Sequence, residues 1–134
     1  MLIIIPTKDR IKELKTTLSF LNNNNFFFKK IIIVDASNFE IKKEIKKTIS
    51  NYNLDIELVD SKPSTCLQRN VGFNFLNNDE YIMFLDDDNI FNLDAFYKMQ
   101  IFLKTHKNFV GVAFNQVYNY RYNFFDKLKK KFYF

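Results

Sequence analysis

A run of five apolar residues that leads directly into three carboxylates constrains this chain more than any other feature. Residues 81–85 are Tyr-Ile-Met-Phe-Leu, and Asp86, Asp87 and Asp88 follow them. A continuous apolar run is typical of a central parallel strand that is buried on both faces. The three acids cannot be buried with it, because like charges repel and an unpaired buried carboxylate is costly. We therefore expect the strand to end at Leu85 and to present the acids at the rim of a sheet, where a divalent cation would remove their repulsion.

Strand-like and helix-like segments alternate along the whole chain. Apolar segments predict strands over residues 2–5, 31–34, 55–59, 81–85 and 109–117, the third of them near a sheet edge. Between them, apolar side chains recur at helical spacing at Ile11, Leu14, Leu18 and Leu21, at Ile41, Ile45 and Ile49, at Leu67, Val71 and Phe75, and at Leu93, Phe96 and Leu103. The expected N-caps are Ser37 or Asn38, Ser64, and Asn92 or Asp94. This alternation predicts an α/β fold, a mostly parallel sheet with helices on both faces.

Carboxylates follow several of the predicted strands. Right-handed crossovers bring the carboxyl ends of parallel strands to one edge of the sheet, and ligands of such folds bind outside that edge. The residues expected there are Thr7, Asp9, Asp35, Asp60 and Asp86 to Asp88. The arrangement indicates a hard cation, Mg²⁺ or Mn²⁺, that is held by Asp oxygens and shared with a phosphate-bearing ligand.

Other nucleotide-binding folds lack their signatures in this chain. A Rossmann dinucleotide site would need G-x-G-x-x-G and a P-loop would need G-x-x-x-x-G-K-[ST], whereas the chain has only Gly72 and Gly111. A phospho-acceptor receiver domain would carry its Asp after the third strand, whereas the acidic cluster here follows the fourth.

Length and charge narrow the function classes further. The 134 residues suffice for one domain, and the single cysteine excludes an internal disulfide and fits a reducing compartment. Residues 118–134 hold five basic residues and one acid, which leaves the body close to neutral within the net charge of +5. Nucleic-acid binders carry basic residues along a working face, so we expect no nucleic-acid partner. No run approaches the roughly 20 apolar residues of a membrane span, and we expect a cytoplasmic protein.

Four motifs in order resemble the family 2 glycosyltransferases of the GT-A fold. They are Ile-Ile-Ile-Pro-Thr-Lys-Asp-Arg at 3–10, Ile-Ile-Val-Asp-Ala-Ser at 32–37, Gln-Arg-Asn-Val-Gly at 68–72, and Tyr-Ile-Met-Phe-Leu-Asp-Asp-Asp-Asn at 81–89. The resemblance covers residues 1 to about 115. It implies a Rossmann-like nucleotide-diphospho-sugar transferase fold and a metal-dependent, inverting hexosyl transfer to a glycan or lipid-linked acceptor, as in polysaccharide biosynthesis.

The resemblance also implies roles for individual residues. Donor-binding roles fall on Pro6, Thr7, Asp9, Asp35, Arg69, Asn70, Asp86 and Asp87, and metal-binding roles on Asp88 and Asp86, the outer pair of a D-x-D element. Asp35 would accept a hydrogen bond from the base, in uridine donors from the ring N–H. The family often carries Asn at the position of Asp9.

One component of the family is not found in this sequence. The general base that deprotonates the acceptor comes from the second half of the family's domain, and we expect it beyond Phe134. The expected organisation is a truncated nucleotide-sugar-binding half-domain over residues 1–117 and a basic, aromatic tail over 118–134. The tail is either the start of the missing half or an anchor on the inner face of the membrane. A truncated, non-catalytic nucleotide-sugar or metal-binding module is the alternative function.

Structural roles compete with each of these assignments. Asp86 to Asp88 would form a solvated turn that caps the next helix, and Asp35 would be a helix N-cap. Arg69 would form a surface salt bridge. Thr7 and Asp9 would cap the first helix.

Overall fold

The computed structural model describes residues 1–25, 28–76, 81–108 and 111–113. Strands and helices alternate along it: β1 (Leu2–Thr7), α1 (Ile11–Asn23), β2 (Lys30–Asp35), α2 (Phe39–Ile49), β3 (Ile56–Asp60), α3 (Thr65–Phe73), β4 (Ile82–Phe84) and α4 (Leu93–Thr105). Contacts divide the chain into two units, Met1–Ile90 and Phe91–Phe134, and α4 belongs to the second.

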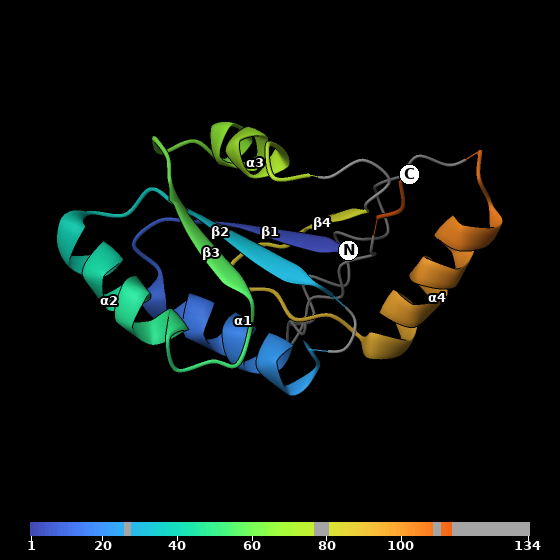
Figure 1. Cartoon of the computed structure of the whole chain (residues 1–134), viewed down its shortest axis with the longest axis horizontal. Coiled ribbons are helices and arrows are strands. Elements are labelled where there is room, and N and C mark those ends of the chain that lie inside the picture. The colour runs from blue at the N-terminus through green and yellow to red at the C-terminus, as the bar shows by residue number, and fades with distance from the viewer. Residues whose placement is uncertain (26–27, 77–80, 109–110, 114–134) are drawn as a thin grey trace, which may run out of the picture. The chain divides into compact units, whose positions relative to one another are not determined.

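The four strands of the first unit form one parallel sheet in the order β3-β2-β1-β4 (Figure 1). Strands β1 and β2 occupy its centre, and five of the six residues of β2 and all six of β1 are buried. Their continuous apolar sequence suits this position, since a central strand is covered on both faces. The predicted α/β fold with a parallel sheet is confirmed.

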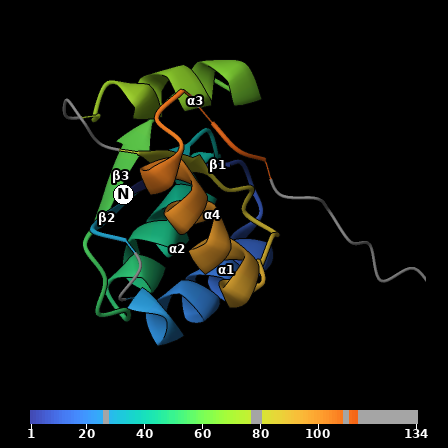
Figure 2. The same ribbon diagram turned by 90° about the vertical axis from the view of Figure 1, so that its right-hand side faces the viewer.

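Helices cover both faces of this sheet. Helices α1 and α2 lie together on one face and α3 lies on the other, as two views at right angles show (Figures 1 and 2). The apolar face of α1 buries Leu14, Leu18 and Leu21 completely, as its spacing predicts. On the other face, a cluster of Leu2, Ile4, Ile32 and Val34 packs against Val71 and Phe75.

The predicted N-caps are confirmed in three helices. Side-chain oxygens of Asn38, Ser64 and Asn92 accept hydrogen bonds from the backbone N–H groups of Ile41, Leu67 and Ala95. Each bond supplies one of the acceptors that the first turn of a helix lacks.

The face of α3 that packs on the sheet differs from the prediction by one position. Leu67 was expected to face inward, but it is 40% exposed, whereas Gln68 and Gly72 are buried. The expectation was wrong because the helix meets the sheet at a close approach that only glycine permits. A Cβ at Gly72 would lie 2.4 Å from Cγ2 of Ile4.

Strand β4 is shorter and more exposed than its apolar sequence suggests. Tyr81 is 40% exposed and Phe84 is 45% exposed, so this run is not buried on both faces. In the sheet of the described residues β4 is an edge strand beside β1. A continuous apolar sequence therefore did not distinguish the central strands from this one.

The last predicted strand and the tail lie largely outside the described residues. Residues 109–110 and 114–134, including the tail over 118–134, are not described, and residues 111–113 carry no regular secondary structure. Within the described ranges, no helix has the length and apolar character needed to cross a bilayer.

Gly72→Ala should destabilise the protein by about 1–3 kcal/mol, because the added methyl group overpacks the contact with the stiff, buried Ile4. Thermal unfolding followed by circular dichroism would measure the effect. Gly111→Ala is the matched control, since a Cβ there meets no atom within 4 Å. Equal melting temperatures for Gly72→Ala and wild type would contradict this account of the α3–β1 contact.

Candidate functional site

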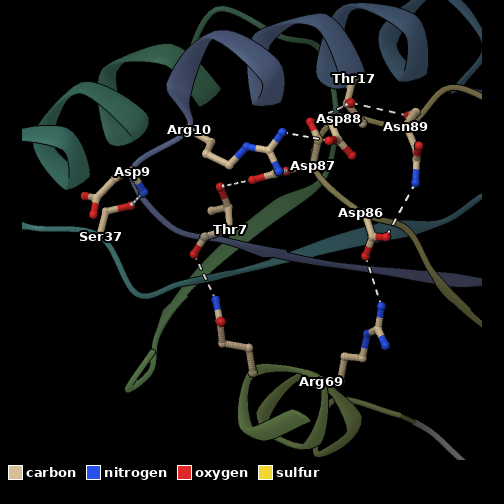
Figure 3. Close-up of polar contacts among 11 residues, drawn as sticks. Thr7, Asp9, Arg10, Thr17, Ser37, Arg69, Asp86, Asp87, Asp88 and Asn89 are labelled. Carbon is tan, nitrogen blue, oxygen red and sulfur yellow. Dashed lines mark hydrogen bonds and ion pairs between the residues drawn. The ribbon is translucent and has the colours of Figure 1, made fainter. Parts of the chain in front are cut away.

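The register of the sheet places the predicted strand-end residues in one row. Thr7 pairs with Asp35, and Asp35 pairs with Asp60. Strand β4 follows the same direction beside β1, so the acidic turn begins at the same edge. The rim therefore brings together a hydroxyl and carboxylates from four strands, as the sequence predicts. Figure 3 shows the part of the rim around Thr7, Asp9 and the acidic turn.

Asp87 points into the protein and anchors the acidic turn. It is 4% exposed, and its Oδ2 accepts a hydrogen bond of 2.7 Å from the Thr7 hydroxyl. Its Oδ1 lies 3.0 Å from Nη1 of Arg10. The hydroxyl of Thr17, a fully buried residue of α1, donates to the backbone oxygens of Asp87 and Asn89. Both the side chain and the backbone of the turn are thus held from β1 and α1.

Asp86 and Asp88 point away from this anchor and stay about half exposed. Asp88 Oδ2 lies 2.6 Å from Nη2 of Arg10, and Asp86 Oδ1 lies 2.9 Å from Nη2 of Arg69. The side chains of the two acids are 44% and 45% exposed. The three neighbouring carboxylates therefore diverge, and two guanidinium groups balance much of their charge. A cation is not needed to relieve their repulsion, contrary to our expectation, and Asn92 rather than these acids caps the next helix.

Asp35 combines complete burial with an unused acceptor. Its Oδ1 accepts a hydrogen bond of 2.9 Å from the backbone N–H of Ser37, while its buried Oδ2 has no hydrogen-bond partner among the described residues. Asn38, not Asp35, caps α2. An unpaired buried carboxylate oxygen is costly, so this atom is a candidate to receive a ligand's N–H group.

Asp9 connects the loop after β1 to the loop after β2. Its φ of 55° is left-handed, a conformation that Asp and Asn adopt more readily than most residues. Its N–H donates to the Ser37 hydroxyl, and its Oδ1 accepts from the N–H and the Nδ2 of Asn38 at 3.0 Å. Helix α1 instead has Arg10 at its N-cap and no side-chain cap. The competing structural role for Thr7 and Asp9, capping of α1, is therefore wrong.

Helix α3 contributes Gln68 and Arg69 to the rim, whereas no contact places the predicted Asn70 there. The Nε2 of Gln68 donates to the backbone oxygens of Thr7 and Val34 at 2.8 and 2.7 Å, which ties the helix to the ends of β1 and β2. Arg69 follows it, pairs with Asp86 and lies over the ring of Phe84, 5.6 Å from its centroid. Its Nε is buried and has no hydrogen-bond partner in the part of the chain that the structure describes. Asn70 is exposed.

Four further polar residues join the rim without having been singled out as site residues: Arg10, Thr17, Lys42 and Gln68. Lys42 of α2 lies 2.8 Å from Asp60, and this hydrogen bond raises the pKa of the lysine. Arg10 and Gln68 each belong to one of the four quoted motifs, which was the available signal for both, and Arg10 also lies in the loop after the first strand, where a basic residue meets an acidic rim. Thr17 and Lys42 belong to helices whose polar residues look like ordinary surface positions in the sequence.

Half-exposed carboxylates at Asp86 and Asp88 fit a hard cation that takes few protein ligands. Among the described residues no group of three His, Cys, Asp or Glu side chains could hold a metal ion. Mg²⁺ and similar cations often use one or two carboxylates and complete their shell with phosphate oxygens and water. The donor set is therefore compatible with a cation that binds together with a phosphate ligand.

Burial raises the pKa of the Asp87 carboxyl above its ordinary value of 3.8, although the Thr7 hydrogen bond and the Arg10 charge oppose the rise. A carboxyl with a raised folded pKa contributes stability that is complete below the unfolded pKa and is lost as the pH rises through the folded pKa. The free energy of unfolding of wild type, relative to Asp87→Asn, should therefore fall as the pH rises from about 3 to about 7. Urea titrations would measure it, with Asp94→Asn, at an exposed position, as the control. If the free energy of unfolding of wild type, relative to Asp87→Asn, rose with pH instead, the hydrogen bond from Thr7 and the charge of Arg10 would outweigh burial.

Comparisons with known proteins agree with this fold and with each other. Residues 2–133 match the family described as Glycosyl transferase family 2. The structure resembles S. aureus TarS 1-349 with a TM-score of 0.64 and 20% identity, over 79% of this chain and 32% of that one. It also resembles S. aureus TarS with a TM-score of 0.58 and 21% identity, over 88% of this chain and 23% of that one.

The chain thus spans about a third or less of the TarS chains that it resembles. No curated protein sequence matches it significantly. The likeness to TarS supports the fold, and the family match covers nearly all of the chain. The chain belongs to glycosyl transferase family 2.

Proposed function

We propose that this domain binds the nucleotide-diphosphate part of a sugar donor along the rim and supports a metal-dependent, inverting sugar transfer. The observation that carries the proposal is the pairing of two different kinds of carboxylate on one sheet edge. Asp35 offers a buried, unpartnered oxygen, whereas Asp86 and Asp88 offer half-exposed ones. A nucleotide-sugar has a matching pair of ends, a base with N–H donors and a diphosphate.

The base lies at Asp35 in this proposal. A ring N–H of uracil or a similar base would donate to the unpartnered Oδ2, while Oδ1 stays bound to the Ser37 N–H. Satisfying a buried acceptor favours binding by more than an exposed hydrogen bond does, because the free protein carries the penalty of the unmade bond. Pro6 and Thr7, at the end of the neighbouring strand, flank this position in register.

The diphosphate lies at the acidic turn in this proposal. Asp88 and Asp86 would hold Mg²⁺ or Mn²⁺, whose chemical contribution is to neutralise charge on the departing diphosphate. Arg69 lies beside Asp86 and offers guanidinium N–H groups, which match phosphate geometry. Asn70 is the next residue of the same helix, on the exposed side.

Three residues of the proposed donor site act through others. Asp87 fixes the turn through Thr7, and Thr7 is 3% exposed, so its hydroxyl serves Asp87 rather than solvent. Asp9 holds the loop that carries Arg10 against Ser37 and Asn38. We assign these residues the task of positioning the groups that contact the donor.

The alternative is a module that binds the donor without transferring the sugar. Inverting transfer needs a general base beside the acceptor hydroxyl, and the rim residues described above all have roles in binding or positioning. We place the base, and the site for a glycan or lipid-linked acceptor, outside the described residues. Turnover of a UDP-sugar by the protein would support the enzyme, whereas metal-dependent binding without hydrolysis or transfer would support the module.

Asp88→Asn should reduce the effect of Mn²⁺ on UDP binding. In wild type we expect Mn²⁺ to tighten UDP binding, and in the variant the ratio of the UDP Kd without metal to that with metal should fall about tenfold or more. Isothermal titration calorimetry would measure both constants. Asp55→Asn is the control, because Asp55 lies directly before β3, at the amino ends of the strands and away from the rim. An unchanged ratio in Asp88→Asn would remove Asp88 from the site.

Asp35→Asn should weaken the binding of the base and leave the binding of the diphosphate unchanged. An amide at this position can still accept from Ser37 but places an NH₂ donor where the base N–H must donate, so UDP should bind about tenfold more weakly or worse in the presence of Mn²⁺. Pyrophosphate with Mn²⁺ should bind as it does to wild type, since it has no base. Equal losses for UDP and pyrophosphate would instead indicate a general disturbance of the rim.

A further inference from the structure

Arg10 bridges two neighbouring carboxylates of the acidic turn. Its Nη1 lies 3.0 Å from Asp87 Oδ1, and its Nη2 lies 2.6 Å from Asp88 Oδ2 (Figure 3). The residue stands immediately before α1, 78 positions away from Asp88 in the sequence. The family resemblance assigned it no role, and in the structure it contacts Asp87 and Asp88 of the acidic turn.

The two carboxylates that hold Arg10 are not equivalent. Asp87 is buried and its other oxygen is bound to Thr7, so that carboxylate is committed to the protein. Asp88 is 44% exposed, and a ligand can compete for it. Arg10 itself is 45% exposed, which leaves part of its guanidinium facing solvent. One of its two ion pairs is therefore fixed and the other is exchangeable.

Arg10 leaves Asp88 only by movement, not by losing its charge. The hydrogen bond to Asp88, together with the charge of Asp87, raises the pKa of Arg10, which keeps the guanidinium protonated under ordinary conditions. A cation at Asp88 would use the same carboxylate and repel the guanidinium. The released fork of N–H donors would lie beside the cation and suits two phosphate oxygens.

We propose that Arg10 is an exchangeable counter-charge. It neutralises Asp88 in the ligand-free protein, and it binds the donor's diphosphate when a cation binds Asp88. The identity of the ligand rests on the proposed function. Arg10 is then a diphosphate-binding residue beyond those proposed above, and its ion pair with Asp88 weakens the binding of the metal alone. The exchange also gives Arg10 opposite effects on the two ligands, which a purely structural residue would not have.

The test compares wild type, Arg10→Gln, Arg10→Lys and Lys15→Gln. Lys15 lies in α1, the helix that begins directly after Arg10, and forms a comparably exposed ion pair with Glu44, so Lys15→Gln is the matched control. Binding of Mn²⁺ alone is followed by the electron paramagnetic resonance of the free ion, and binding of UDP by calorimetry with and without Mn²⁺. Circular dichroism melts show whether each variant is folded.

Arg10→Gln should bind Mn²⁺ alone at least about threefold more tightly than wild type, because Asp88 no longer has a competing partner. The same variant should bind UDP with Mn²⁺ about tenfold more weakly, because the diphosphate has lost a charged donor. Arg10→Lys keeps the charge without the forked donors, so its affinities for Mn²⁺ and UDP should lie between those of wild type and Arg10→Gln. If Arg10→Gln does not fold, Arg10→Lys is compared with wild type instead. The gain in Mn²⁺ binding should disappear in Arg10→Gln/Asp88→Asn.

Mn²⁺ binding to Arg10→Gln that is no tighter than to wild type, including no binding to either, would overturn the inference. An unchanged affinity of Arg10→Gln for UDP would overturn it as well. Failure of wild type to bind UDP in the presence of Mn²⁺ is a different result, because it rejects the proposed function while the Mn²⁺ comparison still decides whether Arg10 and the cation compete for Asp88.

Discussion

The hydrogen bond between the Thr7 hydroxyl and the buried Asp87 carboxylate determines the geometry of the rim. A carboxylate removed from water needs partners, and Asp87 obtains them from Thr7 and Arg10. Once the middle acid is fixed inward, its two neighbours must point elsewhere. Asp86 turns toward α3 and Asp88 toward the start of α1, where arginines meet them. The anchor therefore sets the positions of both carboxylates that face solvent.

Proline in β1 explains why the acidic turn leaves the sheet where it does. Alternate residues of β1 face β4: Leu2 N–H donates to Tyr81 O, and Ile4 O accepts from Leu85 N–H. The next residue on that side is Pro6, which has no N–H to continue the ladder. On the other side β1 stays paired with β2 as far as Thr7. The chain after Leu85 is thus free to turn while the row from Thr7 to Asp60 remains in register.

Local patterns in the sequence predicted the helices and strands from β1 to α4 and the sheet edge at which the candidate site lies. The apolar strands, the helical spacing in α1 and the caps at Asn38 and Ser64 depend on neighbouring residues, so they can be recognised without the fold. The partners of the acids could not be predicted in this way. The pairing of Arg10 with Asp88 joins residues 78 positions apart, and Gln68 reaches two strand-end oxygens only because Gly72 lets α3 approach the sheet.

The balance of charge at the rim changes what a metal would do there. Three acids without partners would attract a cation strongly, even in the absence of a ligand. Here each half-exposed acid already has a guanidinium partner. Under the proposed function a cation would displace one arginine, and it would recover that loss only when a phosphate ligand completes its shell and binds the released arginine. Metal and donor are then expected to bind as a pair. In the proposed donor site the two arginines would thus favour the complete ligand over either of its parts.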